Sequence, residues 1–295
     1  MAERLRETAG DSIPPTRDAK SDGIEMTSTG QHSDAAPAAV LTSGGSDVSC
    51  VIDGPVATIT LDRPSRRNAM SVGMVQGLRT VLETVAVRRD VRIVVLTGSG
   101  DRFFCPGADL DGGGTDAPAS PQPWQLRAAV LLHDMPQLTI AGINGATAGA
   151  GFGWACACDL RVASSSAVFN VAFLAVGVAG DMGLPWTLSH IVGAAKAREL
   201  FMLREKFGAD EALRLGIVSE VFEPAEFRAG LARLVTRLAR AAPTALLTMK
   251  ANFLAAERLS FSDFFDLEIE RHLHLVAGPE FSEGKRAFHD NQRQT

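Results

Sequence analysis

Cysteine is scarce in this sequence. The 295-residue chain has four cysteines, Cys50, Cys105, Cys156 and Cys158. They are too few and too scattered for a disulfide scaffold. Cys156 and Cys158 are separated by one residue, which is not the spacing of a zinc ribbon. We therefore expect all four to be small buried side chains in a reducing compartment.

Long apolar runs and basic blocks are also missing. No stretch of about 20 residues is free of charge and apolar, so no segment is expected to span a membrane. The net charge is −5 and no basic block offsets it, which disfavours a nucleic-acid partner. The opening residues MAERLRETAGDSIPP lack an apolar segment and include three acidic residues, so neither a secretory signal nor an organelle transit peptide is expected. These absences favour a cytoplasmic protein.

The chain does have ample material for a hydrophobic core. Hydrophobic residues make up 46% and charged residues 21%, and the length allows one large domain or two small ones. Residues 1–46 differ from the rest because they are rich in Ser, Thr, Gly, Ala, Pro and Asp and have no apolar period. We predict that this segment is a disordered tail, with a partner-binding arm as the alternative.

From residue 47 onward, strand and helix patterns alternate. Two β-rich runs flank Asp53-Gly54, which is a strong hairpin signal. The stretch SVGMVQGLRTVLETV places four apolar residues on one face of a helix, with Ser71 as its N-cap. VRIVVLTG, at residues 91–98, is a continuous apolar run and is typical of a strand that is buried on both faces.

The same alternation repeats further along the chain. PWQLRAAVLLHDM predicts a helix, LTIAGI predicts a buried strand, and another helix and strand follow through DLRVAS. Such alternation predicts βαβ units with right-handed crossovers. After residue 193 the patterns are helical, with one short strand at IVSEV. The sequence thus predicts an α/β fold, with a core over 47–193 and a helical region over 194–295.

Small residues follow two of the predicted buried strands. VRIVVLTG leads to Gly107-Ala108, and LTIAGI leads to GAGFGWACACDLRV, which begins at Gly149 and does not fit the G-x-G-x-x-G dinucleotide-binding pattern. Ligand sites in open α/β sheets form beyond the carboxyl ends of strands. The two loops could therefore aim two backbone N–H groups at one carbonyl oxygen, as in an oxyanion hole. The alternative is that the glycines serve only tight turns and close packing.

Six stretches together resemble the crotonase (enoyl-CoA hydratase/isomerase) family. They are ITLDRPSRRNAMS, VRIVVLTGSGDRFFCPGADL, AGINGATAGAGFGWACACDLRVAS, GVAGDMGLPWTLSHIVGAAKARELFML, ADEALRLGIVSEVFE and FSEGKRAFHD, and they span residues 48–291 in the family's order and spacing. The resemblance implies a spiral of ββα repeats with C-terminal helices that mediate a homotrimer or hexamer. It also implies substrates that are acyl thioesters of coenzyme A, with no permanently bound cofactor and no metal.

The resemblance further implies where the substrate binds. Members of the family hold the thioester oxygen with two backbone amides, which correspond here to Ala108 and Ala150. An enolate oxygen at this place would also be stabilised by the helix dipole. Contacts with coenzyme A are expected from Arg66, Arg67, Ala69, Ala108, Asp109, Leu110, Lys285 and Arg286, of which Lys285 and Arg286 can serve a neighbouring subunit.

The sequence departs from the hydratase pattern at both acid/base positions. Where the family's hydratases have two glutamates, this chain has Gly153 and Phe173, neither of which can transfer a proton. Asp181 is the only carboxylate between Asp159 and Glu199, and some isomerases and dehalogenases of the family have an Asp at its position. We expect Asp181 to be the catalytic acid/base. The alternative is that Asp181 caps the helix that follows.

The leading hypothesis is therefore an enoyl-CoA isomerase, which shifts a double bond from C3 to C2. Hydration with a relocated acid/base is one alternative, and a non-catalytic acyl-CoA-binding protein is another. Dehalogenation is disfavoured because His133 does not match the position of the histidine that the family's dehalogenases use. Trp154 and Trp186 could border the acyl pocket or simply pack in the core.

Overall fold

The structure is a computed structural model that describes residues 24–28, 39–43, 47–110, 123–203 and 206–292. Within these residues, eight strands form one sheet in the order β1-β2-β3-β4-β5-β7-β9-β12. Strands β1 to β4 pair antiparallel, and β4, β5, β7, β9 and β12 run parallel. The bounds are β1 (Ile24–Ser28), β2 (Ala39–Ser43), β3 (Val48–Asp53), β4 (Val56–Leu61), β5 (Ile93–Gly98), β7 (Leu138–Ile143), β9 (Leu160–Ser164) and β12 (Glu220–Phe222).

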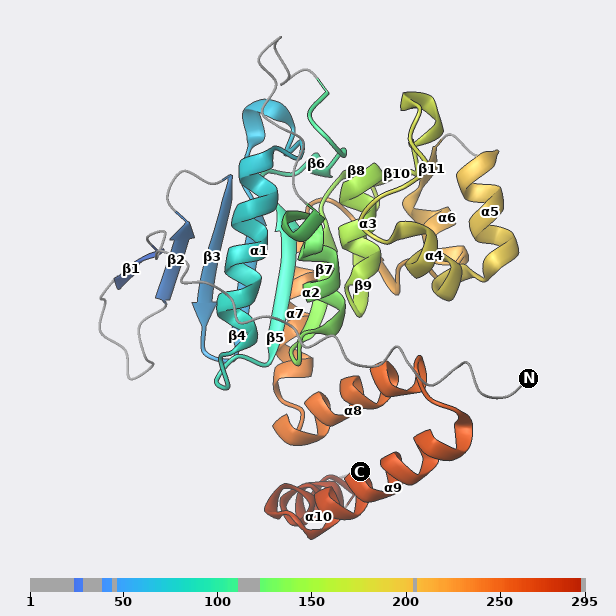
Figure 1. Cartoon of the computed structure of the whole chain (residues 1–295). Helices are drawn as coiled ribbons and strands as arrows, with labels where there is room; N and C mark the ends of the chain where they lie inside the picture. Colours follow the sequence, from blue (N-terminus) through green and yellow to red (C-terminus); the bar gives the residue numbers. More distant parts are fainter. Residues whose placement is uncertain (1–23, 29–38, 44–46, 111–122, 204–205, 293–295) are drawn as a thin grey trace, which may run out of the picture.

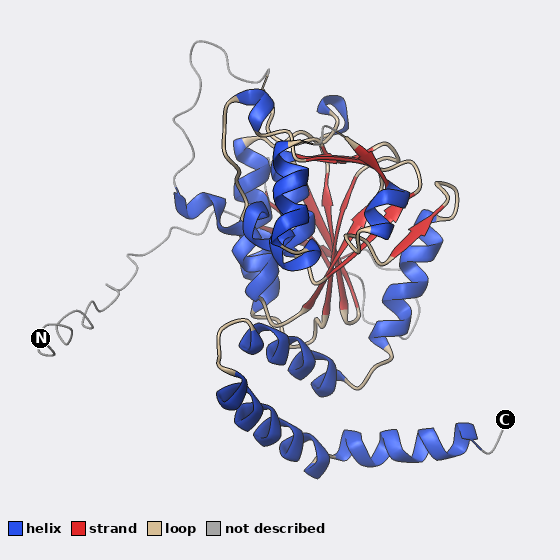
Figure 2. Ribbon diagram, turned by 90° about the vertical axis from the view of Figure 1, so that its right-hand side faces the viewer, coloured by secondary structure: helices blue, strands red, loops and turns tan. Residues whose placement is uncertain are grey.

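A smaller sheet collects the short strands that follow the long ones. Its order is β11-β10-β8-β6, where β6, β8 and β10 run parallel. These strands are β6 (Phe103–Cys105), β8 (Ala146–Ala148), β10 (Val168–Asn170) and β11 (Phe207–Gly208). Each turn of the chain thus supplies one long strand, one short strand and then a helix. Figure 2 shows the short strands lying across the end of the long ones.

Helices cover both faces of the large sheet and continue into a C-terminal arm (Figure 1). The helices α1 to α3 pack on one face and α7 packs on the other. The described helices are α1 (Val72–Ala86), α2 (Ala128–Asp134), α3 (Gly149–Ala157), α4 (Leu184–Val192), α5 (Ala194–Met202), α6 (Ala209–Arg214), α7 (Phe227–Ala239), α8 (Pro243–Ala256), α9 (Phe261–Ala277) and α10 (Pro279–Gln292), with short 3-10 helices η1 (Pro64–Arg66), η2 (Pro123–Arg127) and η3 (Leu174–Val176). Among them, none is both long and apolar enough to cross a membrane.

Local signals placed several of these elements correctly. Gly54, with φ of +51°, turns the β3–β4 hairpin as expected from Asp53-Gly54. Ser71 is the N-cap of α1, because its hydroxyl accepts a hydrogen bond of 3.0 Å from the amide of Met74. β5 and β7 are buried on both faces, as their apolar runs predict. All four cysteines are buried and unpaired, which confirms that part of the prediction.

The predicted disordered tail over residues 1–46 is wrong for two segments. β1 pairs with β2, and β2 pairs with β3 over Ala39↔Ile52 to Thr42↔Ser49. Leu41 of β2 is only 2% exposed and belongs to the main core. The composition concealed these strands because each is only five residues long. The remainder of the predicted tail lies outside the described residues.

The predicted boundary at residue 194 does not separate two units either. β11 and β12 follow it in sequence but join the two sheets, and α5 and α6 contribute to the main core. The region that stands apart from the sheets is α8 to α10, which extends below the core in Figure 1. An ion pair ties this arm to the core: the buried ammonium of Lys250 in α8 lies 2.8 Å from the partly exposed carboxylate of Asp159.

The contribution of β2 to stability can be measured. Leu41→Ala should lower the free energy of unfolding by about 2 kcal/mol, since it removes a buried side chain and leaves a cavity. Val40→Ala, at the half-buried neighbouring position, is the matched control and should cost clearly less. Urea denaturation measures both. If neither variant differs from the wild type, β2 does not pack on the core and the tail prediction stands.

Candidate active site

The two small-residue loops meet where the short strands end. A Cβ atom added at Gly107, in the loop after β6, would lie 3.2 Å from the carbonyl oxygen of Ala148 and 3.8 Å from Cα of Gly149. Backbones this close need residues without bulky side chains. The structure therefore brings together the loop that carries Ala108 and the loop that carries Ala150.

Among the described residues, no backbone oxygen accepts a hydrogen bond from the amide of Ala108 or from the amide of Ala150. Ala108 forms a parallel bridge with Met70, in which Met70 donates to the oxygen of Gly107 and Asp109 donates to the oxygen of Met70. Successive amides of an extended chain point to opposite sides, so the N–H of Ala108 points away from Met70. Ala150 lies in the first turn of α3, where amides have no acceptor within the helix, and no side chain caps this helix.

Glycines in α3 allow the helix to approach its neighbours very closely. A Cβ at Gly151 would lie 2.2 Å from the carbonyl oxygen of Cys105 in β6, and a Cβ at Gly153 would lie 2.6 Å from Cβ of Met182. Both distances are far below van der Waals contact. The packing explanation of these glycines is therefore correct for Gly151 and Gly153. It is compatible with an oxyanion hole, because the same packing seats the N-terminus of α3 beside the Gly107 loop.

Asp181 lies in the loop before α4 and does not cap that helix. The N-cap is Gly183, which has φ of +70°, and no side chain in the described part of the chain makes a capping hydrogen bond there. The Oδ1 atom of Asp181 is buried, and none of the described residues provides a hydrogen-bond partner for it. Burial raises the pKa of Asp181 above the usual range of an aspartate. A carboxylate held in this way is a candidate for proton transfer.

The charge of Asp181 acts on the loop that carries Ala108. Burial raises the pKa of the Cys105 thiol to about 12, and the negative charge of Asp181 adds to that increase. Cys105 ends β6, three residues before Ala108. Met182, the next residue after Asp181, has φ of +48°, a left-handed backbone that is unfavourable for a long side chain. Such strain persists where the surrounding structure imposes it, and it is frequent at functional sites.

A groove of about 480 Å³ begins beside this loop and runs between α2 and α4. Its apolar wall includes Leu126, Ala129, Val130, Met182 and Trp186. Its outer end is charged, with lining residues that include Arg127, His133, Asp134, Glu257 and Arg258. The groove is large enough for the tail of a small organic acyl group.

Comparison with known proteins identifies the family. The sequence pattern of the enoyl-CoA hydratase/isomerase family matches residues 52–295. The chain belongs to the enoyl-CoA hydratase/isomerase family. It is 34% identical over 213 residues to the (E)-benzylidenesuccinyl-CoA hydratase of Thauera aromatica, which covers 69% of this chain and 80% of that protein. It is 30% identical over 252 residues to the 4-chlorobenzoyl coenzyme A dehalogenase-2 of an Arthrobacter species, covering 81% and 89%.

A solved structure shows the same fold. A Thermobifida fusca protein, described as an enoyl-CoA hydratase and crystallised with CoA, superposes with a TM-score of 0.72 at 31% identity. The match covers 79% of this chain and 93% of that one. The spiral of ββα repeats that the resemblance implied is thereby confirmed. This family scaffold carries several chemistries, so the acid/base residues of this chain must be considered individually.

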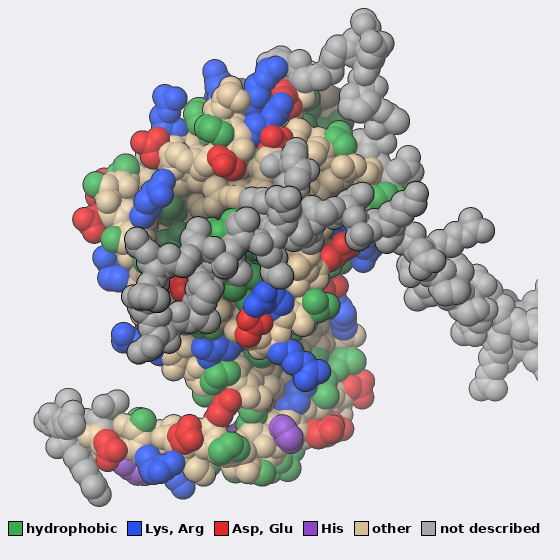
Figure 3. Space-filling model, turned by 90° about the vertical axis from the view of Figure 1, so that its left-hand side faces the viewer, with side chains coloured by type: hydrophobic (Ala, Val, Ile, Leu, Met, Phe, Trp, Pro, Cys, Tyr) green, Lys and Arg blue, Asp and Glu red, His purple; other side chains and the backbone are tan. Residues whose placement is uncertain are grey.

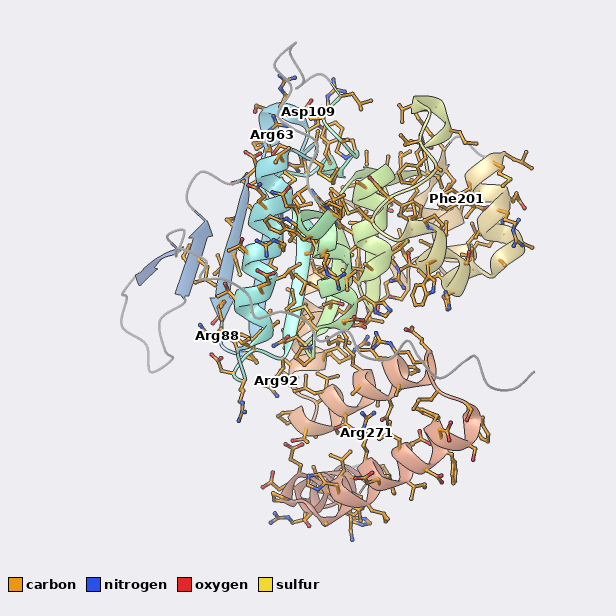
Figure 4. All side chains as sticks on the ribbon, in the orientation of Figure 1. Arg63, Arg88, Arg92, Asp109, Phe201 and Arg271 are labelled. Atoms are coloured by element: carbon orange, nitrogen blue, oxygen red, sulfur yellow. The ribbon has the colours of Figure 1, made fainter. Side chains whose placement is uncertain are left out.

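Neither glutamate position of the family's hydratases holds a carboxylate here. Gly153 faces Met182 and has no room for a larger side chain. Phe173 is 4% exposed, and its ring stacks on Phe201 of α5, which Figure 4 labels, at 6.0 Å between centroids. Both positions are thus filled by packing. Asp181 lies near both loops, since its charge acts on Cys105 and its backbone packs beside Gly153.

The residues predicted to contact coenzyme A fall into two groups. Arg66 and Arg67 are exposed beside the start of α1, and Leu110 is 70% exposed at the end of the Ala108 loop. In Figure 3 several Lys and Arg side chains project from the upper end of the molecule, where Figure 1 places this region. Lys285 lies on α10, at the opposite end of the molecule. Within one chain it is therefore far from the other residues predicted to contact coenzyme A.

The backbone of Ala69 and the carboxylate of Asp109 share a partner, Arg63. The carbonyl oxygen of Ala69 accepts from the guanidinium of Arg63 at 3.2 Å, and the carboxylate of Asp109 accepts from the same group at 2.6 Å. Contacts of Asp109 with coenzyme A would therefore come from its backbone. Arg63 was not predicted as a site residue from the sequence, because its partner Asp109 is 46 residues away.

The remaining candidates differ in their surroundings, and two of them, His133 and Trp186, line the groove. His133 lies between two carboxylates, with Nδ1 at 2.8 Å from Asp134 and Nε2 at 3.3 Å from Glu257. The Nδ1 atom of His190 lies 2.8 Å from the carbonyl oxygen of Trp186. Trp154 is fully buried, so it packs in the core, whereas Trp186 lines the groove.

The amide of Ala150 can be removed without changing a side-chain function. Ala150→Pro should lower turnover of an acyl-CoA substrate by about 10²–10³, because proline has no N–H to donate to the oxyanion. Proline is tolerated in the first turn of a helix, so the fold should persist. Ala150→Ser, which keeps the amide, is the control. Steady-state kinetics and binding of a saturated acyl-CoA give the readout. A folded Pro variant with normal turnover would exclude Ala150 from the hole.

Proposed function

We propose that this protein is an enoyl-CoA isomerase that converts 3-enoyl-CoA to 2-enoyl-CoA, with Asp181 as its one acid/base residue. The observation that carries the proposal is the state of Asp181: its Oδ1 is buried, lacks a partner among the described residues, and caps no helix. The two glutamates of a hydratase are replaced by Gly153 and Phe173. Hydration needs groups that hold and activate water, whereas a double-bond shift needs one base.

The proposed reaction moves one proton. The carboxylate of Asp181 removes a proton from C2 of the 3-enoyl thioester, and the electron pair of the C2–H bond passes into a dienolate. The amides of Ala108 and Ala150 donate to the oxygen on which the negative charge develops. Asp181, now neutral, returns a proton to C4 and the double bond settles between C2 and C3. The carboxylate ends in its starting form.

The surroundings of Asp181 suit this task. Met182 and Phe173 are buried and belong to the same apolar core cluster. Apolar neighbours disfavour the charged carboxylate, which makes Asp181 a stronger base toward an α-proton. They also keep water away from the dienolate, which limits competing hydration.

The groove between α2 and α4 offers room for the acyl tail. Its apolar wall begins at Met182, next to Asp181. The Thermobifida fusca protein was crystallised with CoA, and the Thauera and Arthrobacter relatives are named for CoA thioesters, which supports an acyl-CoA substrate here.

Two further expectations belong to this proposal. Exposed apolar side chains along the C-terminal arm, including Phe253, Phe261, Phe265 and Leu273, support assembly into a trimer or hexamer. Such an assembly would also allow Lys285 to reach the coenzyme A of a neighbouring subunit.

Replacement of Asp181 tests the proposal. Asp181→Asn keeps the shape of the side chain but cannot accept a proton, so turnover of 3-enoyl-CoA should fall by about 10²–10⁴. Asp210→Asn, at an exposed position in α6, is the matched control and should retain normal turnover. Assays with 2-enoyl-, 3-enoyl- and 4-chlorobenzoyl-CoA separate isomerisation from hydration and dehalogenation. Unchanged isomerisation by Asp181→Asn would refute the assignment.

The pH dependence offers a second test. Isomerisation requires ionised Asp181, so kcat/KM should rise with pH and level off above the pKa of that group. Because burial raises this pKa, the midpoint of the rise should lie above the usual range of an aspartate. A pH–rate profile of the wild type measures it. A midpoint at or below the ordinary aspartate value would contradict the proposed environment.

The same shift determines how stability depends on pH. A raised pKa in the folded state means that folding favours neutral Asp181, so this contribution is present at low pH and is lost as pH rises through the folded-state pKa. The side chain of the Asp181→Asn variant does not ionise, so the variant keeps this contribution to stability at high pH. The melting temperature of Asp181→Asn relative to the wild type should therefore be higher at pH 8 than at pH 4. If Asp181 instead capped α4, the variant would not gain melting temperature relative to the wild type at pH 8, since Asn caps a helix about as well as Asp and lacks its favourable charge at the helix N-terminus.

A further inference from the structure

One guanidinium links several parts of the backbone at the start of α1. The Nη1 atom of Arg63 donates to Asp109 at 2.6 Å and to the carbonyl oxygen of Ala69 at 3.2 Å, and its Nε lies 3.4 Å from Asp47. Asp47 in turn accepts at 2.6 Å from the hydroxyl of Ser71, the N-cap of α1. Figure 4 shows Arg63 and Asp109 close together at this end of the molecule.

This ion pair lies next to the candidate oxyanion amide. Asp109 follows Ala108 directly, and its carboxylate is 9% exposed. On the near side of Ala108, the loop is held by the Met70–Gly107 hydrogen bond of 2.8 Å. On the far side it is held by the Asp109–Met70 hydrogen bond of 3.0 Å and by the Arg63 pair. Ala108 itself is exposed, so no packing of its own fixes its peptide group.

We propose that Arg63 is a positioning residue for the oxyanion hole: through Asp109 it fixes the direction of the Ala108 amide. The inference rests on the proposed function, in which that amide holds the thioester oxygen. A planar guanidinium can bind Asp109, Ala69 and Asp47 at once, because its donors point in fixed directions. The same group therefore sets the Ala108 amide relative to the backbone of Ala69, where coenzyme A is expected to lie.

The energetic reason is that an oxyanion hole works only when its donors are in place beforehand. A hydrogen bond weakens steeply as its angle falls, and small misplacement of catalytic groups can reduce rate by about 10². Ground-state binding of coenzyme A depends on many contacts and should be less sensitive. Loss of Arg63 should therefore reduce kcat by about 10–100-fold and change KM far less.

A chromophoric substrate analogue tests this directly. The probe is 4-dimethylaminocinnamoyl-CoA, whose absorption moves to longer wavelength when donors polarise its carbonyl oxygen. It has no proton on C4, so isomerisation does not consume it. The spectrum is recorded with saturating protein for the wild type, Arg63→Gln, Arg63→Lys and Asp109→Asn. Arg88→Gln is the matched control, since Arg88 forms an exposed pair with Asp90 at the other end of α1.

The outcomes separate the inference from the proposed function. We expect a clear red shift with the wild type and Arg88→Gln, and a reduced shift at saturation with Arg63→Gln and Asp109→Asn. Combining these two substitutions should add little, because both break one interaction. Partial recovery in Arg63→Lys, which keeps the charge, would support the proposal. No shift with the wild type would refute the oxyanion hole itself. A wild-type shift that Arg63→Gln and Asp109→Asn retain in full, even with weaker binding, would overturn the inference.

Discussion

The site depends on how closely helix α3 approaches its neighbours. At Gly151 the helix backbone lies against the carbonyl of Cys105, and at Gly153 it lies against Met182, at distances that leave no space for a Cβ atom. The first contact sets the N-terminus of α3 beside the Gly107 loop, so that two amides can serve one oxygen. The second contact seats the loop that carries Asp181. A single packing arrangement therefore determines where the two proposed donors and the proposed acid/base lie.

That arrangement also explains why the proposed catalytic carboxylate, Asp181, lies outside α3. A glutamate at position 153 would have to displace Met182, and with it the backbone of Asp181. In this chain a glutamate at position 153 and the present position of Asp181 therefore exclude each other. Met182 keeps a left-handed backbone conformation because α3 and the core hold it there. The Oδ1 atom of Asp181, the residue before Met182, is buried and has no hydrogen-bond partner among the described residues, which is costly for folding but useful for proton transfer.

The sequence allowed prediction of features that depend on neighbouring residues. Asp53-Gly54 specified the hairpin and Ser71 the start of α1, because both signals act within a few residues. Strands of two or three residues, such as β6 and β11, are too short to show a periodicity, so they were not predicted. The N-cap of α4 could be identified only in three dimensions. The Arg63–Asp109 pair joins residues 46 apart, which spacing alone does not reveal.

The central claim is that one carboxylate serves both carbons, and stereochemistry tests it most directly. A single base must remove the proton from C2 and deliver one to C4 on the same face of the dienolate. The measurement uses 3-enoyl-CoA stereospecifically deuterated at C2, turned over in normal and heavy water, with the configuration at C4 of the product read by NMR. The account predicts that the proton lost from C2 and the proton gained at C4 lie on the same face. Delivery to the opposite face would require a second acid and would contradict the role of Asp181.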